Sequence, residues 1–103
     1  MEYYSLGKQS PNVSFKTAAI PGQAPDKGLY FPEQIPMLDT TMIQHINSYS
    51  KEAIALEVIK PYVGDCIPLE ILKTIVEETV NFPIPLAPIN YKIASLELFH
   101  GPT

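Results

Sequence analysis

The residues best suited to chemistry lie in one run near the end of this sequence, Phe99-His100-Gly101-Pro102-Thr103. A histidine titrates near neutral pH, so His100 could act as a general base or line a pocket. A short apolar strand that leads into a Gly-Pro turn delivers side chains to the rim of a sheet, where loops often carry functional groups. Taken by itself, however, a loop histidine more often only bonds a neighbouring carbonyl.

The other chemistry-bearing residues do not form a site by their spacing. His45 falls within a helical stretch, one step from its apolar stripe, and we expect a solvated or capping role. The single cysteine, Cys66, follows an aspartate whose charge disfavours the thiolate, so we expect an unreactive thiol. Glu77 and Glu78 diverge by about 100° on a helix, which indicates a solvated face rather than an acid/base pair. The sequence predicts neither a metal site nor a complete catalytic set.

The composition indicates one folded domain with many chain turns. The chain has 103 residues, of which 46 % are hydrophobic and 17 % charged, and its eleven prolines favour short elements. The net charge is −4, and all seven basic residues are lysines, which disfavours nucleic acid as a partner. No apolar run is long enough to span a membrane, and the first residues do not resemble a signal peptide. We expect a cytoplasmic protein.

The first 38 residues are predicted to form a small irregular layer of strands with one helix. Its expected elements are a strand over residues 3–5, a helix over 12–20, a turn over 24–28 and a strand over 29–31. Ser14 is the expected N-cap of the helix because its hydroxyl can accept from the first-turn amides. Gly28 is available for a positive φ in the turn.

Residues 39–81 carry the periodicity of three short amphipathic helices. The expected apolar stripes are Met42, Ile43, Ile46 and Tyr49; then Ala53, Leu56, Ile59 and Val63; then Leu69, Leu72, Ile75, Val76 and Val80. Pro61 predicts a kink or an unravelled last turn in the second helix, with Gly64 as its end, and Pro68 suits the first turn of the third. The proline-rich segment 82–89 predicts an extended connector to a strand over residues 93–99. The predicted fold class is therefore α+β.

Several motifs resemble one family and occur in its order. They are Tyr3-Tyr4-Ser5, residues 11–15 (Pro-Asn-Val-Ser-Phe), residues 24–33 (Ala-Pro-Asp-Lys-Gly-Leu-Tyr-Phe-Pro-Glu), Gly64-Asp65 with Ile67-Pro68, and residues 96–103 (Leu-Glu-Leu-Phe-His-Gly-Pro-Thr). Together they resemble the N-terminal domain of threonine synthase, and the resemblance covers the whole chain. The final run is similar to the start of that family's cofactor-lysine motif.

The resemblance implies a pyridoxal-phosphate enzyme that converts O-phospho-L-homoserine and water to L-threonine and phosphate. In the family the cofactor lysine follows His-Gly-Pro-Thr by a few residues, in a Leu-Ala-Phe-Lys-Asp-like run that would lie beyond residue 103. We therefore expect residues 1–92 to be the N-terminal domain and residues 93–103 to be the first strand and loop of the catalytic domain. The run Phe99, His100, Gly101, Pro102 and Thr103 becomes the expected approach to the active site.

These expectations place the chemistry outside the 103 residues. We expect no catalytic, cofactor-binding or metal-binding residue within them, no activity of this chain alone, and pyridoxal phosphate bound only by the full-length parent. The expected partners are the substrate and the remainder of the same chain, and the strand at 93–99 could pair between copies or be disordered. Two alternatives stay open: a threonine-synthase-like phospho-lyase with another product, and a stand-alone binding or assembly module.

Overall fold

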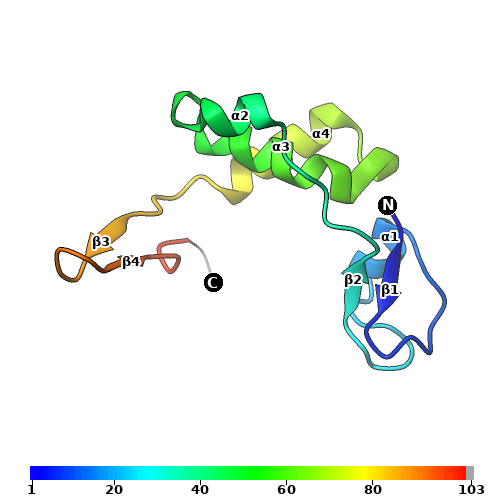
Figure 1. The fold of residues 1–103 in the computed structure, drawn as a ribbon. Coiled ribbons are helices and arrows are strands. Elements are labelled where there is room, and N and C mark those ends of the chain that lie inside the picture. The colour runs from blue at the N-terminus through cyan, green and yellow to red at the C-terminus, as the bar shows by residue number, and fades with distance from the viewer. Residues whose placement is uncertain (102–103) are drawn as a thin grey trace.

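The chain folds as three parts joined by extended segments, as a computed structural model describes for residues 1–101. These parts are a strand layer at the N-terminus, a cluster of helices and a two-stranded hairpin (Figure 1). Pro102 and Thr103 lie outside the described residues. This arrangement confirms the predicted α+β class, with helices and small sheets in separate parts of the chain.

The N-terminal layer pairs β1 (Tyr3–Ser5) with β2 (Tyr30–Pro32) in an antiparallel register that sets Tyr4 opposite Phe31. The helix between these strands, α1 (Phe15–Ala19), begins where the capping residue was predicted. The hydroxyl oxygen of Ser14 accepts a hydrogen bond from the amide of Thr17 at 3.3 Å, which satisfies one first-turn donor.

The turn before β2 is organised by the carboxylate of Asp26. Its two oxygens accept hydrogen bonds from the fully buried hydroxyl of Ser5 at 2.6 Å and from the amides of Gly28 at 2.8 Å and Gln9 at 3.1 Å. The bond from the Ser5 hydroxyl, followed by that from the Gly28 amide, lowers the pKa of the Asp26 carboxyl. This one side chain therefore ties the turn at 24–28 to the loop that follows β1.

The expectation of a positive φ at Gly28 is wrong. The left-handed position in this turn is taken by Lys27, with φ of 67°. Glycine is needed at position 28 for a different reason, because a Cβ there would lie 2.9 Å from the Oδ1 atom of Asp26. The close approach that permits the amide of Gly28 to bond the carboxylate thus leaves no room for a side chain.

The helical part contains the three predicted helices. They are α2 (Thr40–Gln44), α3 (Lys51–Val63) and α4 (Leu69–Thr79), with 3-10 turns η1 (Ile46–Ser48) and η2 (Gly64–Cys66) between them. The backbone of α3 stays helical through Pro61 to Val63, so the last turn does not unravel as expected. The helix ends at Gly64, whose φ of 62° confirms the predicted stop.

The core of the helical part lies between α3 and α4. Val63, Leu72 and Val76 are buried there, and Phe15 of α1 packs against them. The tyrosine hydroxyl of Tyr3 donates to the backbone carbonyl of Tyr62, which joins the strand layer to α3. Burial raises the pKa of this hydroxyl group.

The predicted apolar stripes are only partly buried. Of the first stripe only Met42 is buried. Ile43 is exposed although it lies within α2, and Ile46 and Tyr49 are exposed because α2 ends at Gln44 and they leave its helical face. In the third stripe Leu72 and Val76 are buried, but Leu69 and Ile75 are 54 % and 43 % exposed. Periodicity placed these side chains on one face, but α3 covers only part of it.

The proline-rich segment is more than a connector. Its residues Leu86–Pro88 form β3, which pairs antiparallel with β4 (Ala94–Leu96), so the final strand is shorter than the predicted 93–99 and has a partner within the chain. A backbone hydrogen bond from the amide of Ile89 to the carbonyl of Ile93, at 2.9 Å, closes the hairpin. Proline is tolerated in β3 because each strand of a two-stranded sheet has a free edge.

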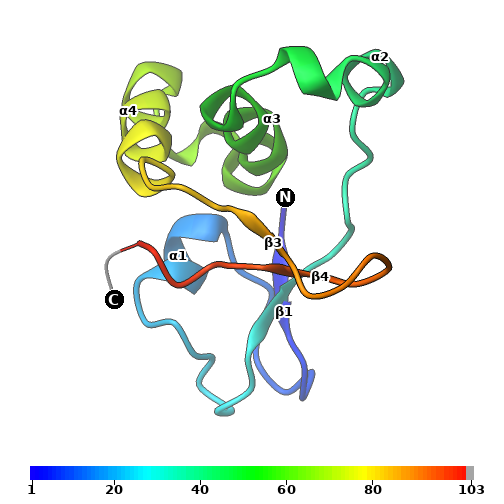
Figure 2. The same ribbon diagram turned by 90° about the vertical axis from the view of Figure 1, so that its left-hand side faces the viewer.

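The molecule is open and exposes much apolar surface, and a second view shows the hairpin passing below the helices (Figure 2). Its radius of gyration is 16.6 Å, whereas a compact domain of this length would have about 13 Å. Its accessible surface is 7810 Å², against about 5,800 Å² for a compact monomer of this mass. The difference, about 2,000 Å², is as large as a substantial interface between domains.

Candidate functional site

The predicted active-site approach begins at Phe99, three residues beyond the end of β4 at Leu96, and makes local contacts. The imidazole Nε2 of His100 lies 2.7 Å from the Oε1 atom of Glu97, so the histidine is paired with a carboxylate rather than with the expected carbonyl. The rings of Phe99 and His100 lie 4.6 Å apart between centroids, and the side chain of Phe99 is 70 % exposed. The structure describes three of the five predicted residues, Phe99, His100 and Gly101.

The segment before β3 meets the segment after β4. The amide of Glu97 donates to the carbonyl of Pro85 at 3.0 Å, one step beyond the β3–β4 ladder. Further along, Gly101 lies against the ring of Phe82, whose backbone carbonyl accepts a hydrogen bond from the ammonium of Lys51. These contacts fix the approach segment to the start of α3 and to the chain that leaves α4, and sequence reasoning did not single out Phe82 or Lys51.

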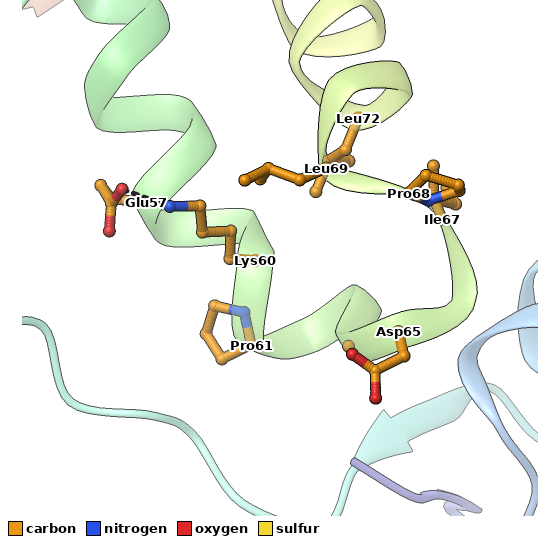
Figure 3. Close-up of a pocket in the computed structure, with 9 residues that line it drawn as sticks. Glu57, Lys60, Pro61, Asp65, Ile67, Pro68, Leu69 and Leu72 are labelled. Carbon is orange, nitrogen blue, oxygen red and sulfur yellow. Dashed lines mark hydrogen bonds and ion pairs between the residues drawn. The ribbon is translucent and has the colours of Figure 1, made fainter.

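A groove of about 580 Å³ lies elsewhere, where α3 turns into α4 (Figure 3). Glu57 and Lys60 line one side of it from α3, where they form an i,i+3 ion pair of 2.7 Å, while Leu69 and Leu72 face it from α4. The groove holds no histidine and no buried charge, and its one cation is already neutralised by Glu57. The geometry gives it no nucleophile or acid/base pair of its own.

A second groove, of about 360 Å³, is apolar and lies on the core side of the two long helices. Side chains from three helices line it, including Phe15, Ile59 and Val76. Exposed apolar residues also cover the hairpin and its extension: Leu86, Ile89, Tyr91, Ile93, Leu96, Leu98 and Phe99. Exposed apolar side chains gathered in this way mark an interface with other protein rather than a surface that faces solvent.

The remaining sequence candidates stay apart in the structure. His45 is an exposed residue at the end of α2, Cys66 is an exposed thiol, and Glu77 and Glu78 are exposed on α4. Within residues 1–101, no three histidine, cysteine or acidic side chains gather in a way that could hold a metal ion. Over the same residues, no helix is long and apolar enough to cross a membrane.

The described residues thus form a small domain with much exposed apolar surface and no catalytic set of its own. The family model described as "Threonine synthase N terminus" matches residues 2–80. This chain belongs to the threonine synthase family. The family predicted from the sequence motifs is confirmed.

Threonine synthases from several bacteria are similar to the chain over its full length. That of Serratia marcescens is 32 % identical over 103 residues and that of Escherichia coli K12 is 34 % identical over the same length. In both cases the match covers all of this chain but only 24 % of the relative. The chain therefore spans about a quarter of the length of the threonine synthases it matches.

Solved threonine synthases share the fold described above. The crystal structure from Escherichia coli gives a TM-score of 0.85 over 98 % of this chain and 24 % of that chain. The PLP-bound structure from Brucella melitensis gives 0.88 over 99 % and 23 %, and both are 33 % identical in sequence. A protein named threonine synthase-like 2 from Rattus norvegicus is 38 % identical over 64 residues, which are 62 % of this chain and 13 % of that protein.

Proposed function

We propose that this chain is the N-terminal domain of a threonine synthase that converts O-phospho-L-homoserine and water to L-threonine and phosphate. The observation that carries the proposal is the match of nearly the whole chain, at a TM-score of 0.88, to 23 % of a PLP-bound threonine synthase. The exposed apolar surface supports it, because the remaining three quarters of such a protein would cover the excess area.

The residues of this chain do not by themselves suit pyridoxal phosphate. The cofactor needs a lysine amine beside a cradle for its phosphate, and it supplies an electron sink for carbanions when bound. Three of the seven lysines are already engaged: Lys51 bonds the carbonyl of Phe82, Lys60 pairs with Glu57, and Lys92 lies over the ring of Tyr91. Segment 93–103 contains no lysine. Cofactor binding is therefore assigned to the parent protein and not to this domain.

We assign residues 1–92 to the N-terminal domain and residues 93–103 to the segment that leads into the catalytic domain. In this division the domain flanks the active site and directs Phe99, His100 and Gly101 toward it, with Pro102 and Thr103 continuing the same run. The 103-residue chain alone would be inactive, since the cofactor lysine would follow this run. A single cysteine fits a reducing compartment, which supports action in the cytoplasm.

Complementation of a threonine auxotroph by the full-length gene tests this function. The expected result is growth without threonine, together with phosphate release from O-phospho-L-homoserine by the purified full-length protein. The matched control is the same gene with its cofactor lysine replaced by alanine, which should support neither growth nor phosphate release. A full-length protein that folds but releases no phosphate would refute the proposal.

The similarity to threonine synthase-like 2 favours one alternative, a threonine-synthase-like phospho-lyase that releases a different product. Chromatography of the products of the same reaction distinguishes the two, because a phospho-lyase of this kind would release phosphate without forming L-threonine. The second alternative, a stand-alone binding module, predicts a natural stop codon shortly after residue 103. The next dozen codons of the gene decide between an Ala-Phe-Lys-Asp-like run and that stop.

In isolation, this chain is expected to associate with itself through the hairpin. Every residue of β4 is exposed, its outer edge has no strand beside it among the described residues, and a two-stranded hairpin alone is marginally stable in water. Sedimentation of the isolated chain over a range of concentrations should show a dimer or larger species. Replacement of Leu96 by lysine should shift it toward monomer, and a concentration-independent monomer would contradict the expectation.

A further inference from the structure

We propose that Phe82 is a positioning residue, which seats Gly101 and so sets the direction in which the active-site approach leaves this domain. The inference rests on the proposed function for its catalytic consequence. Its structural part, the seating of Gly101 on the Phe82 ring, stands on the contacts of this chain alone.

The contact between the two residues is closer than any side chain at position 101 would permit. A Cβ at Gly101 would lie 2.6, 2.8 and 2.9 Å from the Cε1, Cδ1 and Cζ atoms of Phe82. Gly101 is not among the glycines with positive φ, which are Gly22 and Gly64. A side chain at position 101 would therefore force the ring of Phe82 to move, whereas the backbone conformation of Gly101 does not itself call for glycine.

Phe82 can act as a fixed seat because its backbone is held on both sides. It follows the end of α4 by three residues, and its carbonyl accepts the hydrogen bond from Lys51 at the start of α3. The residue after it is Pro83, which restricts Phe82 to extended backbone conformations. The ring is half-buried, so it is partly packed before Gly101 meets it.

The approach segment is held at a second point four residues earlier. The amide of Glu97 bonds the carbonyl of Pro85, and the carboxylate of Glu97 bonds His100. With two points fixed, the chain between them has little freedom to rotate, and the position of Gly101 is set. Loss of either point lets residues 99–101 shift, and a shift of about 1 Å at reacting groups can cost about a hundredfold in rate.

A double-mutant cycle in the full-length protein tests the contact. Phe82→Ala and Gly101→Ala should each lower kcat about tenfold or more while KM for O-phospho-L-homoserine changes by less than about twofold. The double variant should be no slower than the worse single variant, because removing the ring makes room for the new Cβ. Phe82→Tyr keeps the ring and should retain activity, and Phe31→Ala is the control for removing an aromatic ring from the strand layer.

Amide hydrogen exchange gives a readout that does not depend on activity. Residues 99–101 should exchange faster in Phe82→Ala than in the parent or in Phe31→Ala, with the exchange of α3 and α4 unchanged. Should Phe82→Ala not fold, the same cycle with Phe82→Leu replaces it. Additive effects in the cycle, or unchanged exchange at 99–101 with unchanged kcat, would overturn the inference. An inactive parent protein whose exchange responds as expected would overturn the proposed function and leave the seating of Gly101 established.

Discussion

Replacement of Leu72 by alanine should remove about half of the stability of this chain. Leu72 is 4 % exposed and lies in the core cluster with Val63 and Val76. The change removes three carbon atoms, which at about 0.8 kcal/mol each corresponds to roughly 2.4 kcal/mol of lost transfer free energy. Substitutions of this kind cost about 2–5 kcal/mol, the upper values being reached when an enclosed cavity remains.

The site of Leu72 is not enclosed, and this sets the expected value near the low end of that range. The side chain lines both the charged groove of about 580 Å³ and the apolar groove of about 360 Å³, so water can enter the space it leaves. We expect a loss of about 2.5 kcal/mol in the free energy of unfolding. Against a total of about 5 kcal/mol for a chain of this length, this lowers the melting temperature by about 10–20 °C.

Urea unfolding followed by circular dichroism at 222 nm measures this loss, and Leu69→Ala is the matched control. Leu69 lies one turn earlier on the same helix and lines the charged groove, but it is 54 % exposed. Its replacement should change the free energy of unfolding by less than about 0.5–1 kcal/mol. Measurements at two protein concentrations separate folding from self-association. Equal losses for the two variants, or a loss below about 1 kcal/mol for Leu72→Ala, would refute the assignment of the core.

Three further outcomes are expected. Asp26→Asn should lower the urea midpoint at pH 7 and flatten the dependence of that midpoint on pH. The pKa of Asp26 is lower in the folded chain than in the unfolded chain, so its stabilisation is present above the unfolded-state pKa of about 3.9 and is lost as the pH falls through the folded-state pKa. An unchanged acid dependence in the variant would count against this reasoning. Gly64→Ala should lower the free energy of unfolding by about 1–3 kcal/mol in the same assay, because φ of 62° with ψ of −136° is strained for any residue with a Cβ. The loss would come from the backbone alone, since a Cβ at this position would meet no atom within 4 Å. A neutral effect would contradict the backbone conformation of Gly64. Lys27→Gly should leave the melting temperature unchanged or raise it by a few degrees, since it relieves a left-handed conformation at φ of 67°, and a clear decrease would contradict this reasoning.

Local chemistry explains which elements could be predicted from the sequence. Ser14 caps α1 and Gly64 ends α3 because each acts on backbone groups within a few residues of itself. The family could be predicted for a related reason, since its motifs are short runs of neighbouring residues. Such features depend on the order of residues and not on what the chain later meets.

Errors arose where the deciding contact comes from elsewhere in the chain. Gly28 was expected to adopt a positive φ, but its glycine is required by the carboxylate of Asp26, which in turn is held by Ser5. The segment 82–89 was expected to be a connector because prolines exclude a helix, and no local signal shows that it pairs with β4. The exposed Ile75 and buried Val76 are neighbours on one periodic stripe, and only the position of α3 separates them.

The sequence by itself therefore determined the family, the fold class and the caps, whereas the role of the run Phe99 to Thr103 stays a prediction. Tertiary structure decided which apolar residues form a core, how β3 and β4 pair, and what holds Gly101 in place. The physical reason is that capping and periodicity act over one or two helical turns, whereas the contact of Gly101 with Phe82 joins residues separated by a hairpin. Only the folded chain brings such residues together.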